Sequence, residues 1–221
     1  MEEKHTLFGS GINRLEALTD GVFAIVMTLM VFNISLPRDK EITSLREELL
    51  NLWPSFVAYA ISFGMAGIYW SANHNMFRFI KRSSHELHWL TILFLAWVSL
   101  LPFSTGLMAR FHDDVTALVF YGINLELIGL SLFWIWCHAT RNRRLTDPQL
   151  PDAVIRFVQS RIVTGIVGYG AATALAFVNT MAALIVFLLI PSLFILPVIQ
   201  RIWSRKFGLL PGSDYHDHPL P

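Results

Sequence analysis

The chain has 221 residues, of which 54% are hydrophobic and only 15% are charged, and its mean hydropathy is +0.50. Soluble domains carry about 25% charged residues, so this chain has too little polar surface to cover a water-exposed globule of its size. The composition excludes a disordered chain, a disulfide-rich secreted module and an ordinary cytosolic enzyme, and the net charge of +1 provides no basic field for nucleic acid. The single cysteine, Cys137, allows neither an intrachain disulfide nor a cysteine-based zinc site. The remaining class is a polytopic membrane protein.

Six apolar segments are each long enough, at roughly 20 residues, to span a bilayer as a helix. They cover residues 15–36, 54–77, 87–108, 115–138, 155–178 and 180–203. The last two come from one almost uncharged run that is too long for a single span, and we divide it at Asn179 and Thr180. The sequence therefore predicts an all-α integral membrane protein, with a single six-helix domain at residues 1–210 and a polar tail at 211–221.

The segments outside these spans are short. Residues 15–36 predict a retained helix rather than a cleaved signal peptide, because the run is long, contains Asp20 and lacks a small-residue cleavage site before Pro37. Residues 42–52 form a short amphipathic stretch, which is expected to lie at the membrane surface. In the tail, His216 and His218 could contact a metal, but a solvated tail is the favoured interpretation.

Basic residues are concentrated in alternate loops, which predicts the orientation of the chain. With the N-terminus in the cytoplasm, the inner side holds Lys4, Arg14, Arg78, Lys81, Arg82, Arg141, Arg143, Arg144, Arg201, Arg205 and Lys206. The outer side keeps only Arg38, Lys40, Arg46 and Arg110. We therefore expect a multi-pass protein of the cell (inner) membrane, in contact with lipid, with both termini cytoplasmic.

The first predicted helix carries an unusual combination of polar and apolar side chains. Leu18, Val22, Ile25, Leu29 and Phe32 lie on one stripe at alternating steps of four and three residues, and Thr28 borders it. One interpretation is ordinary packing against neighbouring helices. The other is that several copies of the stripe face each other around an axis, so that rings of Ile25 and Leu29 form an apolar constriction that gates by dewetting. Periodicity does not separate the two.

The segment at residues 14–25 reads R-x-x-x-L-T-D-G-V-F-A-I and resembles the R-x-x-x-F-S-D signature of the transmembrane protein 175 family of potassium channels. Residues 70–74 and 100–103, together with six spans and cytoplasmic termini, are also similar to that family. The resemblance implies a potassium-selective leak channel, built as a homotetramer whose first helix from each subunit lines a central pore. It implies potassium as the permeant ion, no cofactor and no bound metal beyond potassium in transit.

The same resemblance implies roles for individual residues. It places the constriction at Ile25, with Leu29 and Phe32 further along the stripe and Thr28 supplying an adjacent layer of hydroxyl groups. It assigns a polar network that holds the first helix in place to Arg14, Thr19, Asp20, Trp70 and His74. The chain departs from the signature at two positions, where Leu18 replaces phenylalanine and Thr19 replaces serine. Phe32 is bulkier than the leucine expected there and could narrow that end.

Residues 167–170 read VGYG, which echoes the TVGYG carbonyl filter of ordinary potassium channels. A true filter needs threonine before that valine, but Ile166 stands there, and the preceding stretch carries Arg156 and Arg161 where a pore helix would be needed. The glycines and alanines around this segment suit close helix packing in lipid. We therefore predict a packed helix at residues 155–178 and no filter.

Other functions remain open at this stage. A proton-coupled secondary transporter could use Asp20, His74 and Glu126, and an accessory subunit would need no pore at all. Glu126 could form an ion site with Asn124, although such carboxyl groups more often serve structure. No enzyme is expected, because the chain contains no G-x-S-x-G or P-loop motif, and His85 and His88 are too close together for a zincin helix.

Overall fold

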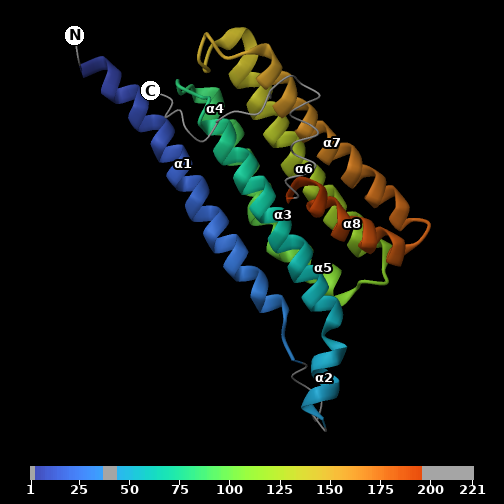
Figure 1. The fold of residues 1–221 in the computed structure, drawn as a ribbon. Helices are drawn as coiled ribbons and strands as arrows, with labels where there is room; N and C mark the ends of the chain where they lie inside the picture. Colours follow the sequence, from blue (N-terminus) through green and yellow to red (C-terminus); the bar gives the residue numbers. More distant parts are fainter. Residues whose placement is uncertain (1–2, 37–43, 196–221) are drawn as a thin grey trace.

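The computed structural model describes residues 3–36 and 44–195, and within these ranges its regular structure is helical apart from one isolated bridge between Ile80 and Thr146. The helices lie side by side as an elongated bundle with α1 at its edge (Figure 1). Their bounds are α1 Glu3–Leu29, η1 Met30–Asn33, α2 Leu45–Asn51, α3 Trp53–Phe77, α4 His85–Ser99, α5 Leu101–Arg110, α6 Val115–Thr140, η2 Arg141–Arg143, α7 Asp152–Ala176 and α8 Thr180–Ile195. The predicted tail with His216 and His218, and the end of the sixth predicted span, lie outside the described residues.

The apolar helices support a membrane protein, although fewer spans are identified than the six we predicted. Within the described residues, three helical segments are long and apolar enough to cross a membrane: Gly11–Asn33, His85–Arg110 and Val115–Arg143. A fourth is counted if α2 and α3, which are bent by 46° relative to each other, form one broken span. α7 carries charged residues along its first half, and the described part of α8 is short. The number six therefore stays a prediction.

The first helix begins earlier than predicted. We expected it at residues 15–36, whereas α1 begins at Glu3 and continues through the 3-10 turn η1 to Asn33. Apolarity marks only the part of a helix that lies in lipid, and no proline interrupts the polar turns that precede this part. The predicted amphipathic stretch at residues 42–52 does contain a helix, α2, which projects from the lower end of the bundle (Figure 1).

The third predicted span, at residues 87–108, is broken into α4 and α5 at Leu100. Pro102 explains the break, because it has no N–H to donate and its ring clashes with the preceding turn. Asparagines from other helices bond to carbonyls around the break: Asn124 Nδ2 donates to Trp97 O at 3.0 Å, and Asn33 Nδ2 donates to Pro102 O at 2.9 Å. Ser104 Oγ in turn donates to Asn124 Oδ1 at 2.9 Å. Polar side chains thus replace the water that lipid does not supply.

α6 and α7 are antiparallel neighbours that approach closely at glycine positions. A Cβ atom at Gly122 would collide with the side chain of Thr173, and one at Gly129 would lie 3.1 Å from Ile166 Cγ1. On α7, Gly168 faces Ile190 of α8. Glycines therefore allow close approach both between α6 and α7 and between α7 and α8. The VGYG segment lies within the continuous helix α7, and Tyr169 is buried, with its hydroxyl 2.6 Å from Met65 Sδ. A helix turns its carbonyls along its own axis, so this segment is not a carbonyl filter.

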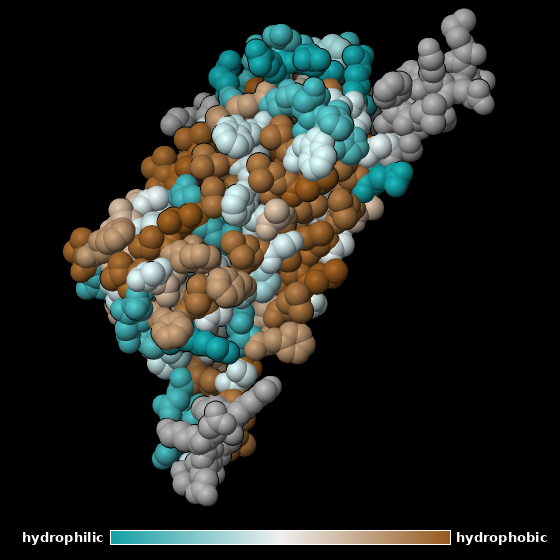
Figure 2. Space-filling view, turned by 180° about the vertical axis from the view of Figure 1, so that it is seen from behind, coloured by the Kyte–Doolittle hydropathy of each residue, from teal (hydrophilic) through white to brown (hydrophobic). Residues whose placement is uncertain are grey.

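The basic loops lie together at one end of the bundle. The backbone N–H groups of Lys81 and Arg82 both donate to Leu145 O, at 2.7 and 3.1 Å, which joins the loop after α3 to the loop after η2. Asn142 and Arg143 have φ values of 53° and 52°, a sharp turn that Arg143 stabilises by bonding to Asp152 at 2.6 Å. Figure 2 shows hydrophilic side chains gathered at this upper end, above a broad apolar band.

The substitution Asn124→Leu tests whether the asparagine stabilises the α4–α5 break. It removes two hydrogen bonds and leaves Trp97 O without its side-chain donor, so we expect the free energy of unfolding to fall by about 1–2 kcal/mol. The midpoint of detergent-induced unfolding measures the change. Asn75→Leu is the matched control, since Asn75 is exposed on α3 and has only a 3.4 Å bond to Ser71 on its own helix. Equal effects of the two substitutions would contradict the prediction.

Candidate functional site

α1 has two different faces. Its buried face consists of Ile12, Leu15, Thr19, Phe23, Val26 and Met30, and this face packs against α3 and α4. Phe23 contacts Phe94 of α4, with ring centroids 5.9 Å apart. The spacing of these residues by three and four positions gives the stripe that an amphipathic helix uses to join a bundle.

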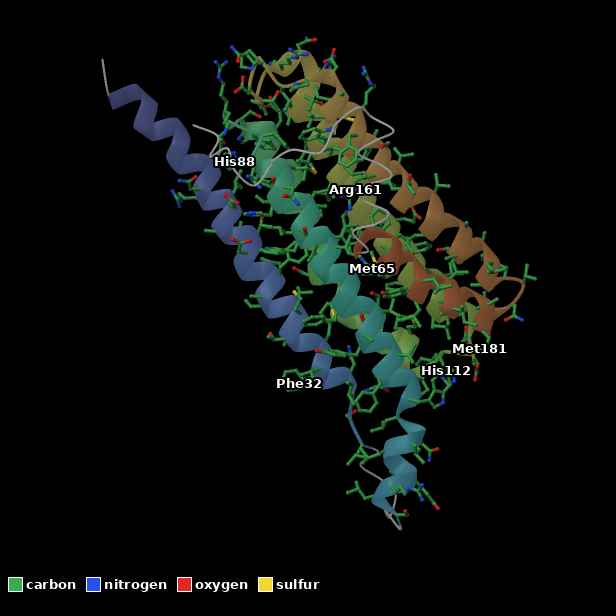
Figure 3. The ribbon with its side chains drawn as sticks, in the orientation of Figure 1. Phe32, Met65, His88, His112, Arg161 and Met181 are labelled. Carbon is green, nitrogen blue, oxygen red and sulfur yellow. The ribbon has the colours of Figure 1, made fainter. Side chains whose placement is uncertain are left out.

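The stripe that we singled out from the sequence lies on the other face. Ile25 is 60% exposed and Phe32 is 75% exposed, while Leu18 and Leu29 are each nearly half exposed. Of the stripe, only Val22 is partly buried against the core. Figure 3 shows Phe32 at the lower end of α1, at the outer edge of the bundle. Packing inside one subunit therefore does not account for the stripe.

Thr28 lies on the same exposed side of α1. Its Oγ1 is 3.0 Å from Ala24 O and 2.9 Å from Ile25 O, so its hydrogen is directed to the carbonyls of its own helix. The hydroxyl oxygen keeps lone pairs with which to accept a bond or to face a cation. The structure thus places an oxygen-bearing side chain one turn from Ile25.

A polar cluster joins α1 to α3. Trp70 Nε1 donates to Asp20 Oδ1 at 2.7 Å, and the indole ring stacks on His74 with centroids 5.6 Å apart and 17° between the planes. His74 Nδ1 lies 2.9 Å from Glu16 Oε1, although the pair is not aligned as a hydrogen bond. Sequence reasoning missed Glu16. Its position one turn before Asp20 on the same helix face was the available signal.

The structure does not bring two other predicted members into this cluster. Thr19 is buried and its hydroxyl donates to Leu15 O at 2.9 Å, within its own helix, rather than to Asp20. Arg14 is exposed, and no polar contact connects it to another residue in the described part of the chain. Asp20, Trp70 and His74 are therefore brought together, and Arg14 and Thr19 are not.

The suggested pair of Glu126 and Asn124 does not form. Asn124 turns toward the break between α4 and α5, whereas Glu126 Oε1 faces α7, 3.4 Å from where a Cβ of Gly170 would lie. Asp20 and His74 meet at the α1–α3 contact, so the three residues considered for a transporter are divided between two helix pairs. Among the residues that the structure describes, no group of three or more His, Cys, Asp or Glu side chains could hold a metal ion.

Fold and site together define an all-helical membrane protein with a polar-anchored edge helix that exposes an apolar face. Residues 14–102, which include the later part of α1, the helices α2, α3 and α4, and the start of α5, match the family described as endosomal/lysosomal potassium channel TMEM175. The chain is 33% identical over 177 residues to a potassium channel of Streptomyces collinus, covering 77% of this chain and 86% of that one. It is 36% identical over 180 residues to a potassium channel of Chamaesiphon minutus, with the same coverage.

A solved structure agrees with these matches. The crystal structure of a lysosomal potassium-selective channel TMEM175 homologue from Chamaesiphon minutus superposes with a TM-score of 0.75 at 28% identity, covering 84% of this chain and 96% of that one. The chain belongs to the TMEM175 family. The resemblance seen in residues 14–25 is confirmed, and the family is one of ion channels rather than enzymes.

The substitution Trp70→Phe tests the anchor between α1 and α3. It removes the indole N–H that bonds to Asp20 but keeps a ring to stack on His74, so we expect a loss of about 1 kcal/mol, a modest value because both groups are exposed. Amide hydrogen exchange should become faster in α1. The control is Trp89→Phe, because the indole of Trp89 bonds only to His85 on its own helix. Unchanged exchange in α1 of the Trp70 variant would argue against an anchoring role.

Proposed function

We propose that this chain is the subunit of a homotetrameric potassium-selective leak channel, in which α1 of each subunit lines a central pore. The observation that carries the proposal is the exposed apolar stripe of α1, centred on Ile25, in a chain whose bacterial relatives are named potassium channels. Potassium is the permeant ion, and the channel needs no cofactor.

The exposed face of α1 suits contact with other copies of itself. Arg14, Leu18, Gly21, Ile25, Thr28 and Phe32 are all exposed and follow one another at steps of four, three, four, three and four residues. This spacing of 3.5 residues is that of a seam between facing helices. A helix face that contacts only lipid is normally apolar, because a charged or polar side chain is costly there. The arginine and the threonine on this face, in register with a glycine, therefore favour contact with another helix or with a pore. Facing copies of α1 would enclose a polar entrance at Arg14 and an apolar ring at Ile25.

The ring at Ile25 supports selection by dehydration. An ion that passes an apolar constriction loses part of its hydration shell, and the loss is larger for the more strongly hydrated sodium ion than for potassium. The hydroxyl oxygen of Thr28, one turn further along, offers partial replacement for that water. A narrow apolar ring expels water, and ions do not cross a passage without water. A small movement of α1 is therefore enough to close the pore at this ring.

The polar cluster between α1 and α3 fits the same proposal. The rotation of a pore-lining helix about its own axis decides which side chains face the pore, so this rotation has to be fixed. The contacts of Asp20 with Trp70 and of Glu16 with His74 join α1 to α3 and are well placed to fix it. We therefore propose that Asp20, Trp70 and His74 position α1, with Glu16 as a further member. Arg14 and Thr19 act in the pore entrance and the packed face, respectively.

The same proposal includes the topology. A single six-helix domain at residues 1–210 would lie in the cell (inner) membrane, followed by the tail at 211–221, with both termini in the cytoplasm. The loop after α3 and the segment from η2 to the loop after it lie at one end of the bundle and carry a cluster of basic residues, which is the pattern of cytoplasmic loops. These residues are Arg78, Lys81, Arg82, Arg141, Arg143 and Arg144.

The experiment that tests the channel is potassium and sodium flux in reconstituted liposomes, with and without Ile25→Asn. The polar side chain would wet the constriction, so we expect conductance to rise and the preference for potassium over sodium to fall by about tenfold or more. The matched control is Ile123→Asn, because Ile123 is 50% exposed but lies on α6. Unchanged selectivity in the Ile25 variant would remove that residue from its proposed role.

The same liposomes distinguish the other functions. Uphill potassium movement driven by a proton gradient would favour a secondary transporter that uses Asp20, His74 and Glu126. Absence of flux in the unmodified chain would favour an accessory subunit. Chemical crosslinking in membranes, with a ladder that ends at four subunits, tests the homotetramer.

Impermeant maleimide labelling tests the orientation. In a Cys137→Ala background, a cysteine at Asn142 in the basic loop should react only from the cytoplasmic side, because the positive charges around it are retained there. A cysteine at Asp113, in the loop before α6, should react only from outside. The two positions serve as controls for each other, and the reverse pattern would overturn the proposed topology.

A further inference from the structure

Glu126 is an acidic residue in the middle of α6, within the segment Val115–Arg143 that is long and apolar enough to cross a membrane. It lies 11 residues after Val115 and 14 residues before Thr140, which correspond to about 17 and 21 Å along the helix axis. The hydrocarbon core of a bilayer is about 30 Å thick, so both of its surfaces lie far from this side chain. The carboxyl group is therefore placed near the middle of the membrane.

The carboxyl group of Glu126 has no polar partner. Its Oε1 atom is enclosed and accepts no hydrogen bond, and within residues 3–36 and 44–195 no ion pair to Glu126 is present. The hydroxyl of Tyr69 on α3 reaches the same turn of α6 but donates to Leu125 O, at 2.9 Å. On α7 the carboxyl group faces Gly170, which has no side chain to offer.

No basic side chain in the described part of the chain is placed to stabilise an ionised Glu126. On α6 the nearest in sequence is His138, twelve residues further on, and on α7 Arg161 precedes Gly170 by nine residues, or about 13 Å along the axis. The described part of α8 carries no charge. α3, α4 and α5, which also pack against α6, have their basic residues in their first or last turns, at His74, His85, His88 and Arg110. A carboxylate at this depth lacks a compensating charge, so the neutral acid is favoured.

Glu126 lies at the edge of the α6–α7 contact, beside exposed apolar side chains. On α6, Ile123 and Leu130 lie one turn to either side of Glu126 and are 50% and 37% exposed. On α7, Val167 lies one turn before Gly170 and is 65% exposed. Figure 1 shows α7 at the edge of the bundle opposite to α1, away from the proposed pore. Because Glu126 is only partly buried, part of its side chain reaches the surface at this apolar edge.

We propose that Glu126 is a proton-binding site within the membrane, whose carboxyl group is held as the neutral acid and is open to the hydrocarbon beside the α6–α7 contact. Such an acid is a modification site for apolar carbodiimides. The acid O–H adds across one C=N bond of the reagent, so that its proton goes to nitrogen and its oxygen bonds to the central carbon. The acyl group then leaves that oxygen for the other nitrogen, and the N-acylurea product keeps every atom of both reactants. The site is separate from the proposed ion path.

Labelling of the full chain in liposomes with dicyclohexylcarbodiimide, followed by mass spectrometry, tests the site. We expect each subunit to gain the mass of one reagent molecule, which peptide mapping assigns to Glu126. A water-soluble carbodiimide with an added amine should instead modify exposed loop carboxyl groups, such as that of Asp113, and leave Glu126 unmodified.

Glu126→Gln should abolish the label. Glutamine is similar in shape to the neutral acid and carries no charge, so the variant should keep the fold. The matched control is Glu86→Gln, which changes an exposed carboxyl group at the start of α4 and should leave the label in place.

Substitution of Gly170 tests the position of the carboxyl group. A Cβ atom at Gly170 would lie 3.4 Å from Glu126 Oε1, so the longer side chain of Gly170→Leu should cover the acid and slow its labelling. Ala171→Leu is the control, because it places a leucine at the next, exposed position of α7, about 100° further around the helix. This variant should be labelled at the rate of the unmodified chain.

The outcomes separate this inference from the channel proposal. A full label on the Glu126→Gln chain, modification of Glu126 by the water-soluble reagent, or an equal rate in the Gly170→Leu chain would overturn the site. Absence of the label from Glu126 of the unmodified chain would overturn it without any variant, so a folding defect in a variant does not protect the proposal. The label does not depend on conduction, and a chain that is labelled at Glu126 but passes no potassium would contradict only the proposed channel.

Discussion

In a lipid bilayer, a carbonyl or side-chain donor that finds no partner within the protein has no water to bond to, and this constraint governs much of the structure. It is clearest at the break between α4 and α5, where Pro102 interrupts the helix. Asn124 of α6 and Asn33 of η1 bond to the carbonyls there, so the interruption also joins segments that are distant in sequence. Deeper in the bundle, Thr105 donates to Ser62, which donates to Tyr121, and the chain of hydroxyls is buried. Polar groups in this protein therefore mark joints between helices.

α1 is the exception to complete packing. One face is buried and anchored to α3 by the Asp20–Trp70 bond, while the opposite face presents Ile25 and Phe32 without partners in the subunit. The rotation of such a helix about its axis is fixed, but one of its faces has no packing partner within the subunit. This arrangement connects the polar cluster to the proposed pore, because the cluster determines which side chains face other copies of α1.

Several elements could be predicted from apolar runs and their boundaries. The second and fourth predicted spans agree with α3 and α6 to within a few residues, since proline in the first turn of α3 and Asp114 before α6 mark their starts. The helical state of the VGYG segment also followed from its neighbours. The break at Leu100 was missed because a helix broken by proline has the same composition as a straight one. The role of Glu16 was missed because its partner, His74, is remote in sequence.

The sequence by itself determined that this protein is helical, lies in a membrane and belongs with the TMEM175 channels, because composition, the length of apolar runs and residues 14–25 are local properties of the chain. Only the tertiary structure decided which face of α1 is buried, which polar residues pair across helices and that Asn124 and Glu126 turn to different neighbours. These outcomes depend on how helices remote in sequence pack against one another. Periodicity places a side chain on a face but does not say what that face meets.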